Sequence, residues 1–163
     1  MKTFFRILLP ILTLLCLVFI FHNSLQDAGR SGERSKGIAN AVSDRYEEVT
    51  KSTVRRPQRD RMYMIVRKIA HLAEYGALAV CMAFSVFAFR GRVGWLYGPL
   101  FGVGILVAAL DEWLQSFSKG RSPAVSDALL DLGGVLLGFC VSLCVTAVIR
   151  RKRRKYELGV SVS

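Results

Sequence analysis

The chain contains 163 residues, of which 52% are hydrophobic, and its apolar residues are gathered in four long runs. Runs of about twenty apolar residues match the hydrocarbon thickness of a bilayer and exclude an ordinary soluble domain. The formal net charge of +11 at pH 7 would favour nucleic-acid binding in a soluble protein. Much of this charge lies close to the apolar runs, however, where membrane topology and anionic lipid headgroups explain it. We therefore expect a lipid bilayer as the partner and no nucleic acid.

The four apolar runs predict an all-α fold, an integral membrane bundle of four transmembrane helices in a single domain over residues 1–163. The first run follows a basic start, which is also typical of a secretory signal peptide. No small-x-small cleavage signature follows it, so we expect an uncleaved anchor. The expected spans cover about residues 4–22, 69–89, 94–117 and 124–149, with an extramembrane segment at 23–66 and a basic tail at 150–163.

An additional helix is expected within the polar segment that joins the first two spans. Ile38, Val42, Tyr46 and Val49 recur at helical spacing, which predicts an amphipathic helix over about residues 33–50. In one interpretation this helix lies on the membrane surface, and in the other it is a solvated linker.

The small side chains of the spans predict helix packing rather than chemistry. The four cysteines, at positions 16, 81, 140 and 144, form neither a CxxC pair nor a His–Cys grouping with metal spacing. We therefore expect them to be apolar fillers of the bundle, and we expect no cofactor. Two sets of glycines in the third and fourth spans permit close helix approach, namely Gly98, Gly102 and Gly104, and Gly133, Gly134 and Gly138.

Basic residues near the ends of the spans predict the orientation of the chain. If the N-terminus is inside, Lys2, Arg6, Arg90, Arg92 and the block at 150–155 are cytoplasmic. A raw count does not favour this side, since ten of the 23 basic residues lie there and the remaining thirteen lie on the other. The dense terminal block and the short basic connector favour it, because basic residues close to the spans set topology. We therefore expect a multi-pass protein of the cell membrane with both termini in the cytoplasm.

Polar and charged residues interrupt the apolar pattern at one end of the predicted bundle. The entry of the second span reads RKIAHLAEY, and the stretch between the third and fourth spans reads DEWLQSFSKGRSPAVSDALLD. Four-span connectivity brings both stretches and the end of the first span to the same membrane face, whichever orientation holds. Five of the twelve acidic residues belong to this cluster. We expect them to pair with cations, because unpaired charge at or below the headgroups is unfavourable.

Two interpretations fit this polar cluster. In the first it is a functional site, in which a carboxylate in a partly dry environment acts as a general acid or base and His71 carries protons. In the second the same residues form a buried hydrogen-bonded and ionic network that fixes the bundle. The number and the depth of the charged groups favour the functional site.

The motifs, taken in order, resemble those of the VanZ-like family of bacterial membrane proteins. They are Ser24-x-Gln26, RKIAHLAEY, DEWLQ, GRSPAVSD and DLGG, and the resemblance extends over roughly residues 4–138. The resemblance implies a link to the glycopeptide antibiotic teicoplanin, since the family's founding member is associated with resistance to it. Asp131 departs from the family pattern, because members commonly have asparagine there, and it adds a charge.

Candidate roles follow from the residue types and from this resemblance. We assign catalytic roles to His71, Glu74, Asp111, Glu112 and Asp127. We assign substrate binding to Ser24, Gln26, Arg67, Lys68, Tyr75, Gln115, Arg121 and Asp131. A metal held by His71 and carboxylates has weak support in the sequence, because HxxE is not the HExxH motif of zinc enzymes, and we expect none.

Three functions are open at this point. The first is an enzyme that performs acid–base hydrolysis or transfer on a lipid-linked or cell-envelope molecule at the outer face. The second is a non-catalytic membrane factor that binds a glycopeptide or an envelope precursor and thereby alters drug susceptibility. The third is proton-linked transport, which four spans without a visible internal repeat disfavour.

Overall fold

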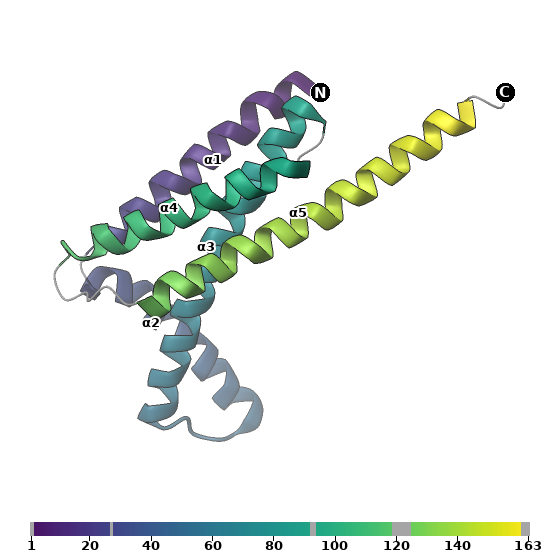
Figure 1. Ribbon diagram of the computed structural model, residues 1–163. Helices are drawn as coiled ribbons and strands as arrows, with labels where there is room; N and C mark the ends of the chain where they lie inside the picture. The colour runs from purple at the N-terminus through teal and green to yellow at the C-terminus, as the bar shows by residue number, and fades with distance from the viewer. Residues whose placement is uncertain (1, 27, 92–93, 119–124, 161–163) are drawn as a thin grey trace.

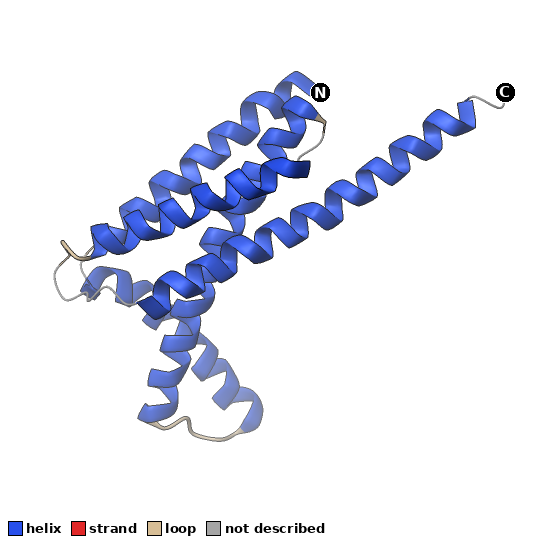
Figure 2. Cartoon of the chain, in the orientation of Figure 1, coloured by secondary structure: helices blue, strands red, loops and turns tan. Residues whose placement is uncertain are grey.

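The computed structural model describes residues 2–26, 28–91, 94–118 and 125–160. All regular secondary structure in this part of the chain is helical (Figure 2), so the expected all-α fold is confirmed. In chain order the helices are α1 (Lys2–Ser24), α2 (Ala28–Thr50), α3 (Arg56–Arg90), the short 3-10 helix η1 (Gly94–Leu96), α4 (Tyr97–Gln115) and α5 (Val125–Val160).

Four segments of the described chain are helical, long and apolar enough to cross a membrane. They are Thr3–Ser24, Arg56–Arg90, Gly94–Gln115 and Ser126–Arg154. Helix α2 is the additional helix between the first two. The chain is therefore a multi-pass membrane protein, in which every spanning segment satisfies its own backbone hydrogen bonds.

Two helices begin earlier than the sequence patterns predict. Helix α2 starts at Ala28 rather than near Glu33 and includes Gly29 and Gly32. A glycine within a helix costs only about 1 kcal/mol, so these two residues do not prevent the helix from forming.

The sequence places the start of the second long helix near Asp60 and its membrane entry near Ile69, but α3 starts at Arg56. Pro57 lies in its first turn, where the missing N–H would have no helical partner. Helix α5 continues beyond its apolar part and carries exposed arginines of the basic tail.

Figure 1 shows the arrangement of the helices. Helices α1 and α4 lie side by side and run in the same direction, while α3 and α5 form the most extensive helix contact in the bundle. Helix α2 folds back on the first part of α3 to form a hairpin, which lies below the bundle in this view. The end of α1, the middle of α3, the end of α4 and the start of α5 therefore meet at one end of the bundle.

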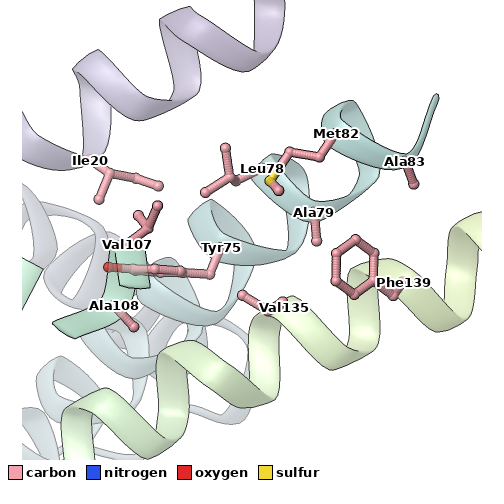
Figure 3. Close-up of a cluster of buried hydrophobic side chains, with 10 residues drawn as sticks. All are labelled: Ile20, Tyr75, Leu78, Ala79, Met82, Ala83, Val107, Ala108, Val135 and Phe139. Carbon is pink, nitrogen blue, oxygen red and sulfur yellow. The ribbon is translucent and has the colours of Figure 1, made fainter. Parts of the chain in front are cut away.

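An apolar core joins these four long helices. Figure 3 shows Tyr75 and Leu78 of α3 at its centre, and both are fully buried. Val135 and Phe139 of α5 cover one side of them, and Ile20 of α1 covers the other. Most remaining large apolar side chains of the spans face outward, as lipid contact requires.

A carboxylate holds the turn between α2 and α3. Glu47 Oε1 accepts hydrogen bonds from the Val54 N–H at 2.6 Å and from Arg59 Nη2 at 3.1 Å. These donors hold the pKa of Glu47 below its ordinary value, and the Val54 N–H has the larger effect. Arg59 also pairs with Asp44 at 3.0 Å. The contacts fix α2 against α3.

The apolar stripe predicted for α2 does not face α3. All four residues of the stripe are exposed, Val49 most of all at 69%. Ala39 and Ser43 are buried against α3 instead, and Ser43 Oγ lies 3.0 Å from Met62 Sδ. An exposed apolar stripe of this kind fits a helix that lies on the membrane surface.

Two glycines of α5 allow α3 and α5 to approach closely. A Cβ added at Gly134 would lie 2.5 Å from the Leu72 carbonyl oxygen, and one added at Gly138 would overlap the Gly76 carbonyl oxygen. Both obstacles are backbone atoms of α3, so an added side chain would force the two helices apart. Gly134 and Gly138 therefore pack as predicted, whereas a Cβ at Gly133 would make only an ordinary contact with Leu72 at 3.7 Å.

Replacing Gly134 with alanine is expected to destabilise the protein by about 1–3 kcal/mol, the usual range for overpacking. Thermal unfolding in detergent would measure this as a lower midpoint. Gly102→Ala is the matched control, because Gly102 has open space around it among the described residues. The same holds for Gly98, so the close packing predicted for these two glycines of the third span is absent among the described residues. Equal midpoints for the two variants would contradict the close contact.

Candidate functional site

A pocket of about 190 Å³ opens where α1, α2, α3 and α4 meet. One part of its wall is apolar and includes Phe19, Ile38 and Val66. The polar part of the wall consists of Asn23, Ser24, Gln26, Ser35, Arg67, His71, Glu74 and Asp111. The pocket therefore offers polar groups and an apolar surface to the same ligand.

Asp111 is the best-anchored carboxylate of the pocket. It is 1% exposed and accepts hydrogen bonds from the Ser24 hydroxyl of α1 and from Gln115 Nε2 at 2.8 Å. Asp111 and Gln115 are four residues apart, so they lie on the same face of α4. Ser24 is held in turn, because the Ser118 hydroxyl donates to its carbonyl oxygen at 2.7 Å. These bonds tie the ends of α1 and α4 together.

A histidine and a second carboxylate meet between α3 and α5. His71 Nδ1 lies 3.5 Å from Asp131 Oδ1, an ion-pair distance that is long for a hydrogen bond. Asp131 is fully buried, and neither of its oxygens has a hydrogen-bond partner among the described residues. One ligand-type atom each from His71, Asp111 and Asp131 lies within 4.8 Å of the other two.

Glu74 and Tyr75 follow His71 along α3. Glu74 lines the pocket, and its Oε1 accepts a hydrogen bond from Asn23 Nδ2 at 3.3 Å. Tyr75 is fully buried, and its hydroxyl lies on the side of the carboxylates Asp111 and Asp131. A single stretch of α3 therefore supplies a wall of the pocket and a part of the core.

The remaining predicted site residues take different places. Gln26 and Arg67 line the pocket, whereas the Lys68 side chain is exposed and does not. Glu112 and Asp127 are half-buried and lie outside the pocket wall. Arg121 lies outside the described residues.

Sequence reasoning missed residues that shape the pocket. Asn23 had no assigned role, although it precedes Ser24 and bonds to Glu74. Ser118, which bonds to the backbone of Ser24, lies in a polar turn with no helical periodicity to place it. Ser35 of α2 was missed as well, because only the tertiary fold brings α2 to this end of the bundle.

A bundle of four apolar helices with buried carboxylates and an imidazole beside a pocket at one end defines a polytopic membrane protein with an intramembrane polar site. The family model described as VanZ/LLP1 matches residues 9–147, a stretch that includes every described residue of the pocket. The chain therefore belongs to the VanZ/LLP1 family. Comparison with curated proteins and with solved structures gave no match.

Replacing Ser24 with alanine is expected to lower the stability of the protein by about 1–3 kcal/mol, since a buried carboxylate would lose a donor. The midpoint of thermal unfolding is again the measurement. Ser116→Ala is the control, because that exposed hydroxyl, just after α4, donates only to the Trp113 carbonyl oxygen among the described residues. If both variants unfold like wild type, the bond between α1 and α4 does not contribute to stability.

Proposed function

We propose that the pocket binds the polar head of a lipid-linked or cell-envelope molecule, and that the protein thereby affects susceptibility to glycopeptides such as teicoplanin. The observation that carries this proposal is the composition of the pocket wall. Arg67, His71 and Glu74 offer charge and hydrogen bonds, while Phe19 and Ile38 offer apolar surface. A molecule with an anionic or sugar-like head and a lipid chain matches both parts of this wall.

The burial of the carboxylates supports a binding role beyond packing. Asp111 and Asp131 are buried within segments apolar enough to cross a membrane, where ionisable groups are costly and usually functional. Glycines and apolar side chains already hold α3 against α5 without them. Membership of the VanZ/LLP1 family supports the link to the cell envelope.

Enzymatic action on the same molecule is the second candidate function. Glu74 favours it, because this carboxylate lines the pocket and stands three residues from His71 on the same face of α3. In this reading Glu74 or Asp111 is the general base, and Arg67 holds an anionic group of the substrate.

The distribution of arginines supports the proposal that the pocket faces the outside and both termini face the cytoplasm. Arg6 Nε donates to the Ala88 carbonyl oxygen at 3.0 Å, and Arg150 and Arg153 lie over the Phe87 ring. These arginines gather at the end of the bundle opposite the pocket. Cytoplasmic ends of membrane helices carry such an excess of basic residues.

A cysteine introduced at the exposed position Ser52 is expected to react with an impermeant thiol reagent in intact cells. The matched control is Arg151→Cys, which should react only after the cells are permeabilised. Both changes belong in a background without the four native cysteines, two of which are exposed on α5. Labelling of Arg151→Cys alone in intact cells would place the pocket on the cytoplasmic side.

In a drug-sensitive Gram-positive host, the wild-type protein is expected to change teicoplanin susceptibility. Glu74→Gln, Asp111→Asn and Glu112→Gln are expected to abolish this change at matched expression. Purified Glu74→Gln should also bind a lipid-linked envelope precursor about tenfold more weakly, since bonds to charged groups contribute about 1.5–3 kcal/mol. Glu48→Gln is the control, because Glu48 is an exposed residue of α2 that pairs with Arg45.

Mass spectra of envelope lipids and muropeptides from the same cells separate the two candidate functions. Binding alone leaves these molecules unchanged, whereas an enzyme produces a new species or removes one. Unchanged susceptibility with the wild-type protein, together with no precursor binding, would contradict the proposed function.

A further inference from the structure

We propose that His71, Asp111 and Asp131 together bind one divalent transition-metal ion, with zinc as the best fit, at the inner wall of the pocket. This inference rests on the proposed function, because it concerns the same pocket and names what would hold the head of the bound molecule. Two carboxylates and one imidazole are a ligand set that zinc accepts.

The distances among the three side chains suit a shared ion. Zinc–nitrogen and zinc–oxygen bonds are about 2.0–2.2 Å long, so two ligand atoms of a tetrahedral ion lie about 3.4 Å apart. His71 Nδ1 and Asp131 Oδ1 are 3.5 Å apart. All three ligand atoms lie within 4.8 Å of one another, so side-chain shifts of about 1 Å would close them onto one ion.

Unpaired buried atoms provide the second, independent observation. Both oxygens of Asp131 and Nδ1 of His71 are buried without a hydrogen-bond partner among the described residues. Buried polar atoms are rarely left without a partner, because the lost hydration is costly. A cation bound to His71 Nδ1 and to one oxygen of Asp131 would give both of these atoms a partner.

Hydrogen bonds orient the carboxylate of Asp111, the third proposed ligand. Ser24 and Gln115 each donate to a different oxygen of Asp111 and so fix the plane of its carboxylate. Each carboxylate oxygen has two lone pairs, so an accepted hydrogen bond leaves one free for a metal. Hydrogen bonds of this kind hold metal-binding carboxylates in place in other proteins.

The pocket gives the proposed ion an entry path and an open position. His71 and Asp111 line the pocket, whereas Asp131 lies behind them in the bundle. Three protein ligands leave the fourth position of a tetrahedral zinc ion for water or for a ligand oxygen. A phosphate or carboxylate oxygen of the bound molecule would fit this position, with Arg67 of the pocket wall nearby to balance its charge.

Metal content of the purified full-length protein tests the proposal. The protein is loaded with Zn²⁺ in lipid nanodiscs, desalted and measured by inductively coupled plasma mass spectrometry, and about one ion per chain is expected. Asp131→Asn and His71→Ala are each expected to lower zinc affinity by about tenfold or more. Asp60→Asn is the control, because this carboxylate is exposed on α3.

Cobalt provides a measurement that does not depend on variants. Co²⁺ bound by these side chains is expected to absorb visible light with the intensity of a four-coordinate ion, and Zn²⁺ should abolish the absorption. Wild-type protein that keeps neither Zn²⁺ nor Co²⁺ would overturn the proposal and leave His71 and Asp131 as an ion pair. Equal zinc affinity in the wild type and in a folded Asp131→Asn variant, judged by circular dichroism, would overturn it too.

Zinc content and precursor binding, measured on the same protein, distinguish a failure of the metal site from a failure of the proposed function. Arg67→Ala should weaken binding of the lipid-linked precursor and leave the zinc content at one ion per chain. Precursor binding by a protein that retains no metal contradicts the metal site alone. A full zinc content with no precursor binding and no effect on drug susceptibility contradicts the proposed function alone.

Discussion

The close approach of α3 and α5 is the constraint on which the rest of the structure depends. Gly134 of α5 lies directly against the Leu72 carbonyl of α3. Because His71 precedes Leu72 and Asp131 lies one turn before Gly134, this contact brings the imidazole and the buried carboxylate together. A larger residue at Gly134 would separate the helices and open the polar cluster along with the core.

The buried carboxylates of the polar cluster are unfavourable in the apolar surroundings that enclose them, unless they have partners. Burial of Asp111 is compensated by donors from two helices, Ser24 of α1 and Gln115 of α4. Asp131 has no such donors among the described residues, and its ion-pair partner is the imidazole of His71. Two equally buried carboxylates therefore differ in what holds them: hydrogen bonds fix Asp111 in place, whereas Asp131 has only an ion pair with the imidazole.

Much of the fold and of the site could be predicted from the sequence. The apolar runs identify the four long helices because a spanning helix needs about twenty apolar residues and no partner to define it. Connectivity alone places His71, Asp111 and Asp131 at the same end of the bundle. Lys68 shows the limit of this reasoning, because it is adjacent to Arg67 in the sequence, yet its side chain is exposed outside the pocket.

The sequence by itself determined that this is a helical membrane protein of the VanZ/LLP1 family with ionisable groups at one end, because hydropathy and ordered motifs are local properties. Only the tertiary structure decided which of those groups touch. The pairing of His71 with Asp131 and the anchoring of Asp111 by Ser24 depend on the rotation and spacing of whole helices. Those are set by packing at positions such as Gly134, where neighbours distant in the chain meet.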